Sequence, residues 1–169
     1  MNLIEIITKL FGNKAQKDMR AIQPYVEKIK VAYEHIDSLS NDELRALSQS
    51  LMARLQEVVA DKKHRIAELK SSIEDLEIDQ REKVYNEIDK LEKEIKDQYE
   101  STLTDMLPDV FAIVKSTARR FAENETVEVT ATPMDKDLAA DSRYDFVEIE
   151  GERAIYHTTW MAGGNEVSW

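Results

Sequence analysis

Two short heptad seams inside a strongly charged stretch constrain this chain more than any other feature. Their apolar positions recur at alternating three- and four-residue steps: Ile66, Leu69, Ile73 and Leu76, then Val84, Ile88, Leu91 and Ile95. Such spacing is typical of coiled-coil helices. Between positions 61 and 100, 22 of the 40 residues are charged, so the other helix faces would be solvated and joined by i,i+4 pairs.

The two seams are out of phase, because the step from Leu76 to Val84 is eight residues. Either one helix carries a skip, or the chain reverses near residues 78–81, where Asp79 with Glu82 could cap a second helix. Each seam has only about three turns, which is too short to hold a helix alone. We therefore favour an antiparallel hairpin, in which each seam buries the other.

Amphipathic helices are predicted on both sides of this stretch. Residues 3–11 carry an apolar arc that Gly12-Asn13 would end. Pro24 is expected in the first turn of a helix that runs through Ile36, and Ser40 with Glu43 forms a capping box for a helix from Asn41 to at least Ala60.

Leu107-Pro108 is expected to begin a further helix. Its predicted apolar face consists of Val110, Phe111, Val114, Thr117, Ala118 and Phe121. Arg119 and Arg120 lie in its last turn, where cations favour the helix dipole.

The pattern changes after Phe121. Residues 126–130 alternate with period two, which predicts a strand, and residues 132–141 are expected to form a polar loop. Residues 144–149 and 154–159 are rich in β-formers, with Glu150-Gly151 as a hairpin turn and Gly163-Gly164 as a flexible connection. The predicted fold class is mainly α, with amphipathic helices, a helical hairpin and a small C-terminal β-hairpin.

Composition excludes several kinds of function. A formal net charge of −11 argues against non-specific nucleic-acid binding, and the absence of cysteine excludes disulfides and thiolate sites. No apolar run is long enough for a membrane span. The chain has no glycine-rich phosphate loop, and its three histidines lack paired ligand spacing. We therefore predict no catalytic, cofactor-binding or metal-binding residue within it.

The first helix allows two interpretations: packing on its own protein, or docking on a lipid surface or a partner. Its apolar face and nearby cations are Leu3, Ile4, Ile6, Ile7, Leu10, Phe11, Lys9, Lys14 and Lys17.

Three stretches, in order, resemble the N-terminus of the SecA family, ATP-driven motors of bacterial preprotein translocation. They are LIEIITKLFGN at 3–13, LSNDELRALSQSLMARL at 39–55 and LPDVFAIVKSTARR at 107–120. The charged stretch at 61–100 and the segment 122–169 are longer than the usual family connections. Met52 stands where the family usually has phenylalanine.

The resemblance implies a division into four parts. These are N-terminal helices at 1–60, an inserted charged hairpin at 61–103, a motor-domain helix at 104–121 and an acidic segment with a β-hairpin at 122–169. They would form the N-terminal part of a RecA-like α/β motor domain. The family's nucleotide motifs lie beyond this stretch, so ATP with magnesium is expected for the parent protein and no ATP turnover for these 169 residues.

The resemblance also implies partners. The first helix would contact anionic lipid and the protein-conducting channel, with Lys9, Lys14 and Lys17 near lipid phosphates. Preproteins would be substrates of the parent, a homodimer is compatible, and nucleic acid is not expected. The location would be cytoplasmic, peripheral at the inner face of the bacterial cell membrane. The alternative is a free-standing helical coiled-coil interaction module without catalytic activity.

Overall fold

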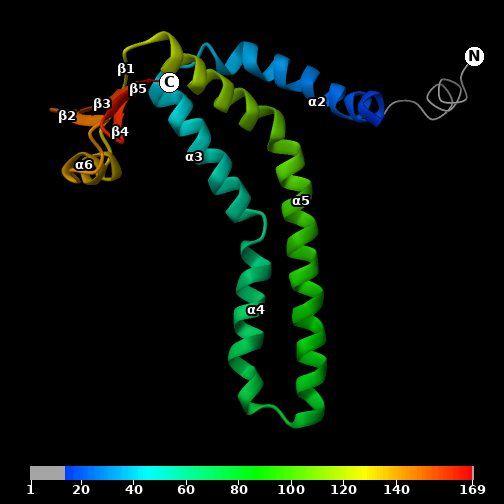
Figure 1. Cartoon of the computed structure of the whole chain (residues 1–169). Coiled ribbons are helices and arrows are strands. Elements are labelled where there is room, and N and C mark those ends of the chain that lie inside the picture. Colours follow the sequence, from blue (N-terminus) through cyan, green and yellow to red (C-terminus); the bar gives the residue numbers. More distant parts are fainter. Residues whose placement is uncertain (1–13, 169) are drawn as a thin grey trace, which may run out of the picture. The chain divides into compact units, whose positions relative to one another are not determined.

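The computed structural model describes residues 14–168 (Figure 1). They form two compact units. One contains residues 14–42 together with residues 108–168, and the other spans Glu43–Leu107. Within the described residues no helix is long and apolar enough to cross a membrane.

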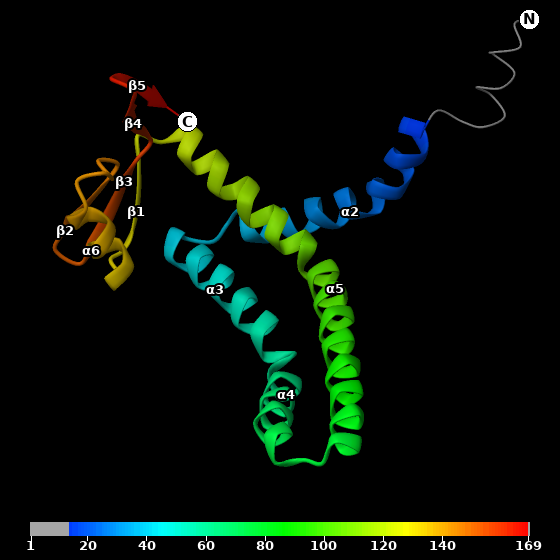
Figure 2. The same ribbon diagram turned by 60° about the horizontal axis from the view of Figure 1, so that its bottom comes forward.

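The unit 43–107 is a helical hairpin. It contains most of α3 (Asn41–Glu57), then α4 (Ala60–Ser72), the 3-10 turn η1 (Ile73–Asp75) and the first part of α5 (Ile78–Glu123). Figure 2 shows α4 and α5 running side by side in opposite directions. Their contact is a cluster of the two predicted seams, with Ile66, Leu69 and Ile88 buried and Ile73, Val84, Leu91 and Ile95 packed around them. The predicted antiparallel hairpin is confirmed.

The reversal lies slightly ahead of the predicted position. The chain turns at Leu76 and Glu77, and Asp79 lies inside the first turn of α5 instead of capping it. Arg81 holds the turn, because its Nε donates to the Leu76 carbonyl at 2.9 Å and its Nη2 to the Glu74 carbonyl at 3.1 Å. Hydrogen bonds from the Arg81 side chain therefore stabilise this turn, as glycine or proline stabilises other turns.

Polar contacts follow the edges of the hairpin. Arg65 pairs with Glu87 at 3.0 Å and Lys70 with Glu92 at 3.3 Å, and all four side chains are about half exposed. Such pairs contribute at most about 1 kcal/mol each. They fix the register of the helices, while the buried seam supplies the stability.

Two helix boundaries differ from the prediction. The helix that begins at Asn41 ends at Glu57, and Val59, fully buried, forms the junction to α4. α2 (Lys14–Ile36) contains Pro24 in its interior, instead of beginning near it. Both Pro24 and Arg20, whose carbonyl loses its backbone donor, are exposed, so water can replace the missing hydrogen bond.

The helix predicted to begin at Leu107-Pro108 is the continuation of α5, which passes through Pro108. Its buried face also differs. Ala112 and Ser116 have no exposed surface, whereas Phe111 is 57% and Val114 61% exposed. Small side chains allow another backbone to approach closely, which is why they occupy the contact face and the larger apolar residues do not.

The C-terminal part of the first unit is a small β structure. β1 (Thr126–Thr130), β2 (Val147–Glu150) and β3 (Arg153–His157) form an antiparallel sheet in the order β1-β3-β2. The β1 bounds equal those predicted, and the predicted hairpin turn is confirmed at Gly151, whose φ of 60° suits glycine. Val129, Val147 and Ala154 provide the buried face.

Two predicted loops are ordered elements. Residues 132–141 contain α6 (Pro133–Ala140), because Thr132 and Asp135 form a capping box with proline at the first helical position. Gly163 and Gly164 are not a flexible connection. They make the tight turn between β4 (Thr159–Ala162) and β5 (Asn165–Ser168), both with positive φ. The β content is therefore a three-stranded sheet plus a separate hairpin.

Candidate functional site

Most of the predicted docking residues lie outside the described part of the chain: Leu3, Ile4, Ile6, Ile7, Lys9, Leu10 and Phe11. Lys14 and Lys17 are described, in the first two turns of α2, and both are exposed. Of the predicted docking residues, the structure therefore describes two lysines, and both face solvent. Their role in docking remains a prediction.

A polar junction connects α2 to the second half of α5. Arg119 Nη2 lies 2.9 Å from Asp37 Oδ1, and the buried Ser116 hydroxyl donates to the same oxygen at 2.8 Å. These two donors hold the pKa of Asp37 below its usual value, with Ser116 as the larger cause. In turn, Asp37 and Glu123 raise the pKa of Arg119, so this guanidinium stays charged.

Arg120 extends the junction to the start of α3. Its Nη1 donates to Asn41 Oδ1 at 2.6 Å, and its Nη2 donates to the carbonyl of Leu39. The two arginines were predicted only as cations that favour a helix dipole. In the folded chain they tie the end of α5 to the corner between α2 and α3, which is a structural role.

The same corner covers one edge of the sheet. Asn41 Nδ2 donates to the Glu128 carbonyl at 2.9 Å, and Asp42 Oδ1 accepts from the Thr130 amide at 2.8 Å. These backbone groups point away from β3 and lie on the open edge of β1. If they were free, another strand could pair with β1 through them. Side chains of α3 occupy them instead.

Asp135 is a fully buried carboxylate. One of its oxygens accepts from the Thr132 amide and hydroxyl, both at 2.7 Å, and the other accepts from the Tyr156 hydroxyl. Three donors satisfy the charge, as a buried carboxylate requires. The arrangement joins α6 to the central strand of the sheet.

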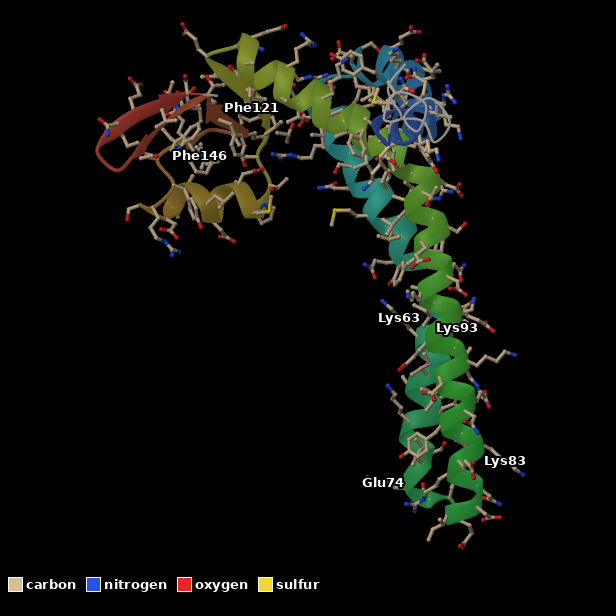
Figure 3. The ribbon with its side chains drawn as sticks, turned by 45° about the vertical axis from the view of Figure 1, so that its right-hand side comes forward. Lys63, Glu74, Lys83, Lys93, Phe121 and Phe146 are labelled. Atoms are coloured by element: carbon tan, nitrogen blue, oxygen red, sulfur yellow. The ribbon has the colours of Figure 1, made fainter. Side chains whose placement is uncertain are left out.

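An aromatic pocket lies in the same unit. It has a volume of about 350 Å³ and is lined by Phe121, Phe146, Tyr156, His157 and Trp160. Figure 3 shows Phe121 near the end of α5 and Phe146 just before β2, both close to the C-terminal strands. Sequence reasoning did not predict this pocket, because its residues come from one helix, one loop and two strands. The spacing of these residues along the chain carries no signal.

Two of the three histidines lie beside glutamates. His64 lies beside Glu68 and His157 beside Glu148, at 3.5 and 3.1 Å, and the described residues contain no cluster of three acidic, histidine or cysteine side chains that could hold a metal ion. What this part of the chain offers chemically is surfaces: the cations of α2, the exposed apolar side of α5 and the aromatic pocket.

Comparisons with known proteins agree on one family. The family described as the SecA DEAD-like domain matches residues 7–133. The chain is 53% identical over 169 residues to the protein translocase subunit SecA of Parabacteroides distasonis, and 48% identical over 169 residues to that of Porphyromonas gingivalis. It is 41% identical over 171 residues to the same subunit of Flavobacterium psychrophilum.

Each of these alignments covers the whole chain but only 15% of the relative. This chain therefore spans a small part of the length of the relatives it matches. No solved structure matches it significantly.

Proposed function

Because this chain belongs to the SecA family of protein translocase subunits, we propose that it forms the N-terminal region of a motor that couples ATP hydrolysis to protein export. The family match and the full-length alignments support this assignment. Preproteins would be the substrates and the membrane channel the partner. ATP with magnesium would bind to other parts of the parent protein, so the 169 residues alone would not hydrolyse ATP.

The observation that carries the proposal is the apolar side of α5. Val110, Phe111 and Val114 are all exposed, although the helix is well packed on its other side through Ala112 and Ser116. The chain spans 15% of the length of its relatives. We therefore expect the rest of the same polypeptide to pack on this exposed apolar surface. In this proposal α5 is a scaffold on which the remainder of the motor domain packs.

A second part of the proposal concerns the start of the chain. The apolar arc of residues 3–11, together with Lys9, Lys14 and Lys17, has the composition of a helix that lies on an anionic lipid surface. It would hold the motor peripherally at the inner face of the cell membrane, next to the channel. A homodimer is compatible with this arrangement.

The motor proposal is tested by translocation. The product of the open reading frame that contains this chain is mixed with inverted membrane vesicles, a radiolabelled preprotein and ATP, and protease-protected preprotein is measured. We expect protection that depends on ATP. Absence of ATP-dependent protection would overturn the proposal, and so would ATP hydrolysis by the 169-residue chain alone.

The scaffold role has its own variant in the same assay. Phe111→Asp places a charge on the apolar side of α5 and should abolish most of the protection. Ile78→Asp is the matched control, since Ile78 is 83% exposed at the far end of the same helix. Equal translocation by both variants would remove α5 from the proposal while leaving the motor assignment intact.

Lipid docking is tested by co-sedimentation with vesicles. We expect binding to vesicles with one-third phosphatidylglycerol and little binding to pure phosphatidylcholine. Lys14→Glu with Lys17→Glu should weaken it roughly thirtyfold, by about 1 kcal/mol for each cation removed. Lys83→Glu with Lys93→Glu, two exposed cations of the hairpin (Figure 3), makes the same change in net charge. Equal losses in both double variants would mean that only net charge matters.

A further inference from the structure

The helix α2 carries a heptad seam that is buried only at its C-terminal end. Ile36, the last residue of the seam, is 3% exposed, whereas Ile22 is 51% and Met19 60% exposed. The burial of the residues between them is intermediate. The first part of the seam is therefore an apolar surface of the shape that a second helix covers. The seam follows alternating three- and four-residue steps and consists of Met19, Ile22, Val26, Ile29, Tyr33 and Ile36.

The sequence directly ahead of α2 has the matching pattern. Residues 3–11 lie outside the described part of the chain, which begins with α2 at Lys14. Within them Leu3, Ile7 and Leu10 recur at a four- and a three-residue step. A helix of about nine residues is too short to hold its shape alone in water. The predicted helix at 3–11 therefore needs an apolar surface on which to form.

The connection between the two segments suits a reversal of the chain. Only Gly12 and Asn13 separate residues 3–11 from α2, and two residues are enough to join two antiparallel helices. Glycine and asparagine also favour the left-handed conformation that ends many helices. A reversal here would place Ile7 opposite Met19 and Leu3 opposite Ile22, since the members of each pair are about equally far from the turn.

The short tether favours this segment over other occupants of the seam. A partner two residues away has an effective concentration in the millimolar range, and this concentration falls as the connecting chain becomes longer. In the motor proposal the rest of the polypeptide follows residue 169, so a far longer path joins it to α2. A second copy of the chain is disfavoured by repulsion, because each copy carries a net charge of −11.

We propose that residues 3–11 fold back as a helix onto α2, cover Met19 and Ile22, and leave this position for an anionic lipid surface. The two positions exclude each other, because one apolar arc cannot face α2 and lipid at once. The fold-back goes beyond the proposed function, and only the exchange with lipid rests on its docking part. The seam of α2 is then uncovered only when the start of the chain lies on the membrane.

Paired cysteines test the fold-back. The chain contains no cysteine, so two introduced thiols report only their own proximity. Ile7→Cys with Met19→Cys is oxidised with copper phenanthroline in the 169-residue chain, and the disulfide within one chain is measured by mass after alkylation. The control is Ile7→Cys with Ala21→Cys, because Ala21 is exposed and lies on the opposite side of α2 from Met19. We expect cross-linking at least tenfold faster in the first pair.

Vesicles test the exchange with lipid. Vesicles with one-third phosphatidylglycerol should slow cross-linking of the Ile7–Met19 pair several-fold, and pure phosphatidylcholine should leave it unchanged. Met19→Ser with Ile22→Ser removes the competing surface without a change in charge. It should therefore strengthen co-sedimentation with the anionic vesicles roughly two- to fivefold. Val31→Ser, at a position 71% exposed on another side of α2, is the control and should bind as the wild type does.

Three outcomes would overturn the fold-back. Equal rates in the two cysteine pairs would mean that residues 3–11 are not held on the seam. A disulfide between two chains, seen as a dimer of twice the mass, would assign the seam to a second copy. Loss of the Ile7–Met19 disulfide in the product of the whole open reading frame would assign it to the rest of the polypeptide.

The same measurements separate this inference from the docking proposal. Binding to anionic vesicles without preferential cross-linking would refute the fold-back alone. Preferential cross-linking without vesicle binding would refute lipid docking alone, together with the exchange that rests on it. Cross-linking that vesicle binding does not slow would refute the exchange.

Discussion

Asp37 gathers hydrogen bonds from two residues of α5, and its protonation has a predictable cost. Its carboxylate accepts hydrogen bonds from Ser116 and Arg119. These bonds lower the pKa of Asp37 relative to the unfolded value of about 3.9. A lowered pKa in the folded state means that the charged form stabilises the fold. This contribution is complete well above pH 3.9 and is lost as the pH falls through the lower, folded-state pKa.

The acid sensitivity of this junction is measurable. We expect the unfolding temperature of the first unit, followed by circular dichroism, to fall as the pH drops below about 3.9. Asp37→Asn should unfold at a lower temperature at pH 6 and show a weaker dependence on pH. Asp105→Asn, an exposed residue of α5, is the control and should retain the wild-type profile. An unchanged pH profile in Asp37→Asn would contradict the prediction.

Among single residues, the sequence reveals chemical type but not the partner. Arg119 and Arg120 stood out as cations at a helix end, yet their partners, Asp37 and Asn41, lie about 80 residues earlier. The five pocket residues were equally unpredictable, because they approach one another only after the sheet has formed. Local rules describe contacts within about one helical turn, and these contacts are not local.

Local rules do govern α6, where Thr132 provides the N-cap. Its hydroxyl accepts from the Asp135 amide and donates to the Asp135 carboxylate. Thr132→Val should therefore destabilise the chain by about 1 kcal/mol in urea unfolding, while Thr132→Ser keeps the hydroxyl and most of the stability. Equal losses in both variants would contradict the assignment to the cap, because serine keeps the hydroxyl group and valine does not.

The seam of the hairpin supports a prediction with a matched pair. Ile88 is 4% exposed and Ile78 83% exposed, on the same helix. Ile88→Ala should cost about 2–5 kcal/mol, whereas Ile78→Ala should change stability by less than about 0.5 kcal/mol. Hydrogen exchange of amides in α4 and α5 reports this loss directly. Similar protection in the two variants would show that the seam does not stabilise the hairpin.

Elements with a strong period were predictable, and junctions were not. The heptad seams gave the hairpin and the alternation at 126–130 gave β1, because both patterns describe one buried face. Three junctions depend on tertiary contacts or hydration instead of a local pattern. They are the reversal at Leu76, the break at Val58-Val59 and the passage of α5 through Pro108. The capping box of α6 was present in the sequence, and its significance was hidden by the polar composition around it.

At the scale of the whole molecule, the two sides of α5 after Pro108 respond differently to charge. Phe111→Lys with Val114→Lys should leave the unfolding temperature of the 169-residue chain nearly unchanged, because both side chains are mainly exposed. It should also reduce binding of the dye ANS, which reports exposed apolar surface. Ala112→Lys, at a position with no exposed surface, should unfold this unit.

The opposite result is informative. A large fall in unfolding temperature in the double variant would mean that Phe111 and Val114 pack within this chain, and the surface would then be unavailable to the rest of a motor.

Family membership was predicted from three short stretches of sequence. The division into parts at 1–60, 61–103, 104–121 and 122–169 stays a prediction, and α5 runs as one helix through its second and third boundaries, 103/104 and 121/122.

The contacts between Asn41, Asp42 and β1 also have a consequence for synthesis on the ribosome. Asn41 is made 87 residues before Glu128, which is roughly 4–17 seconds at the usual speed of translation. When β1 emerges, its central partner β3 does not yet exist, and an unpaired strand is then most prone to aggregate. Asn41 and Asp42 have already been made by then, so the edge of β1 that faces away from β3 has its partners before the sheet forms, and only the β3-facing edge must wait.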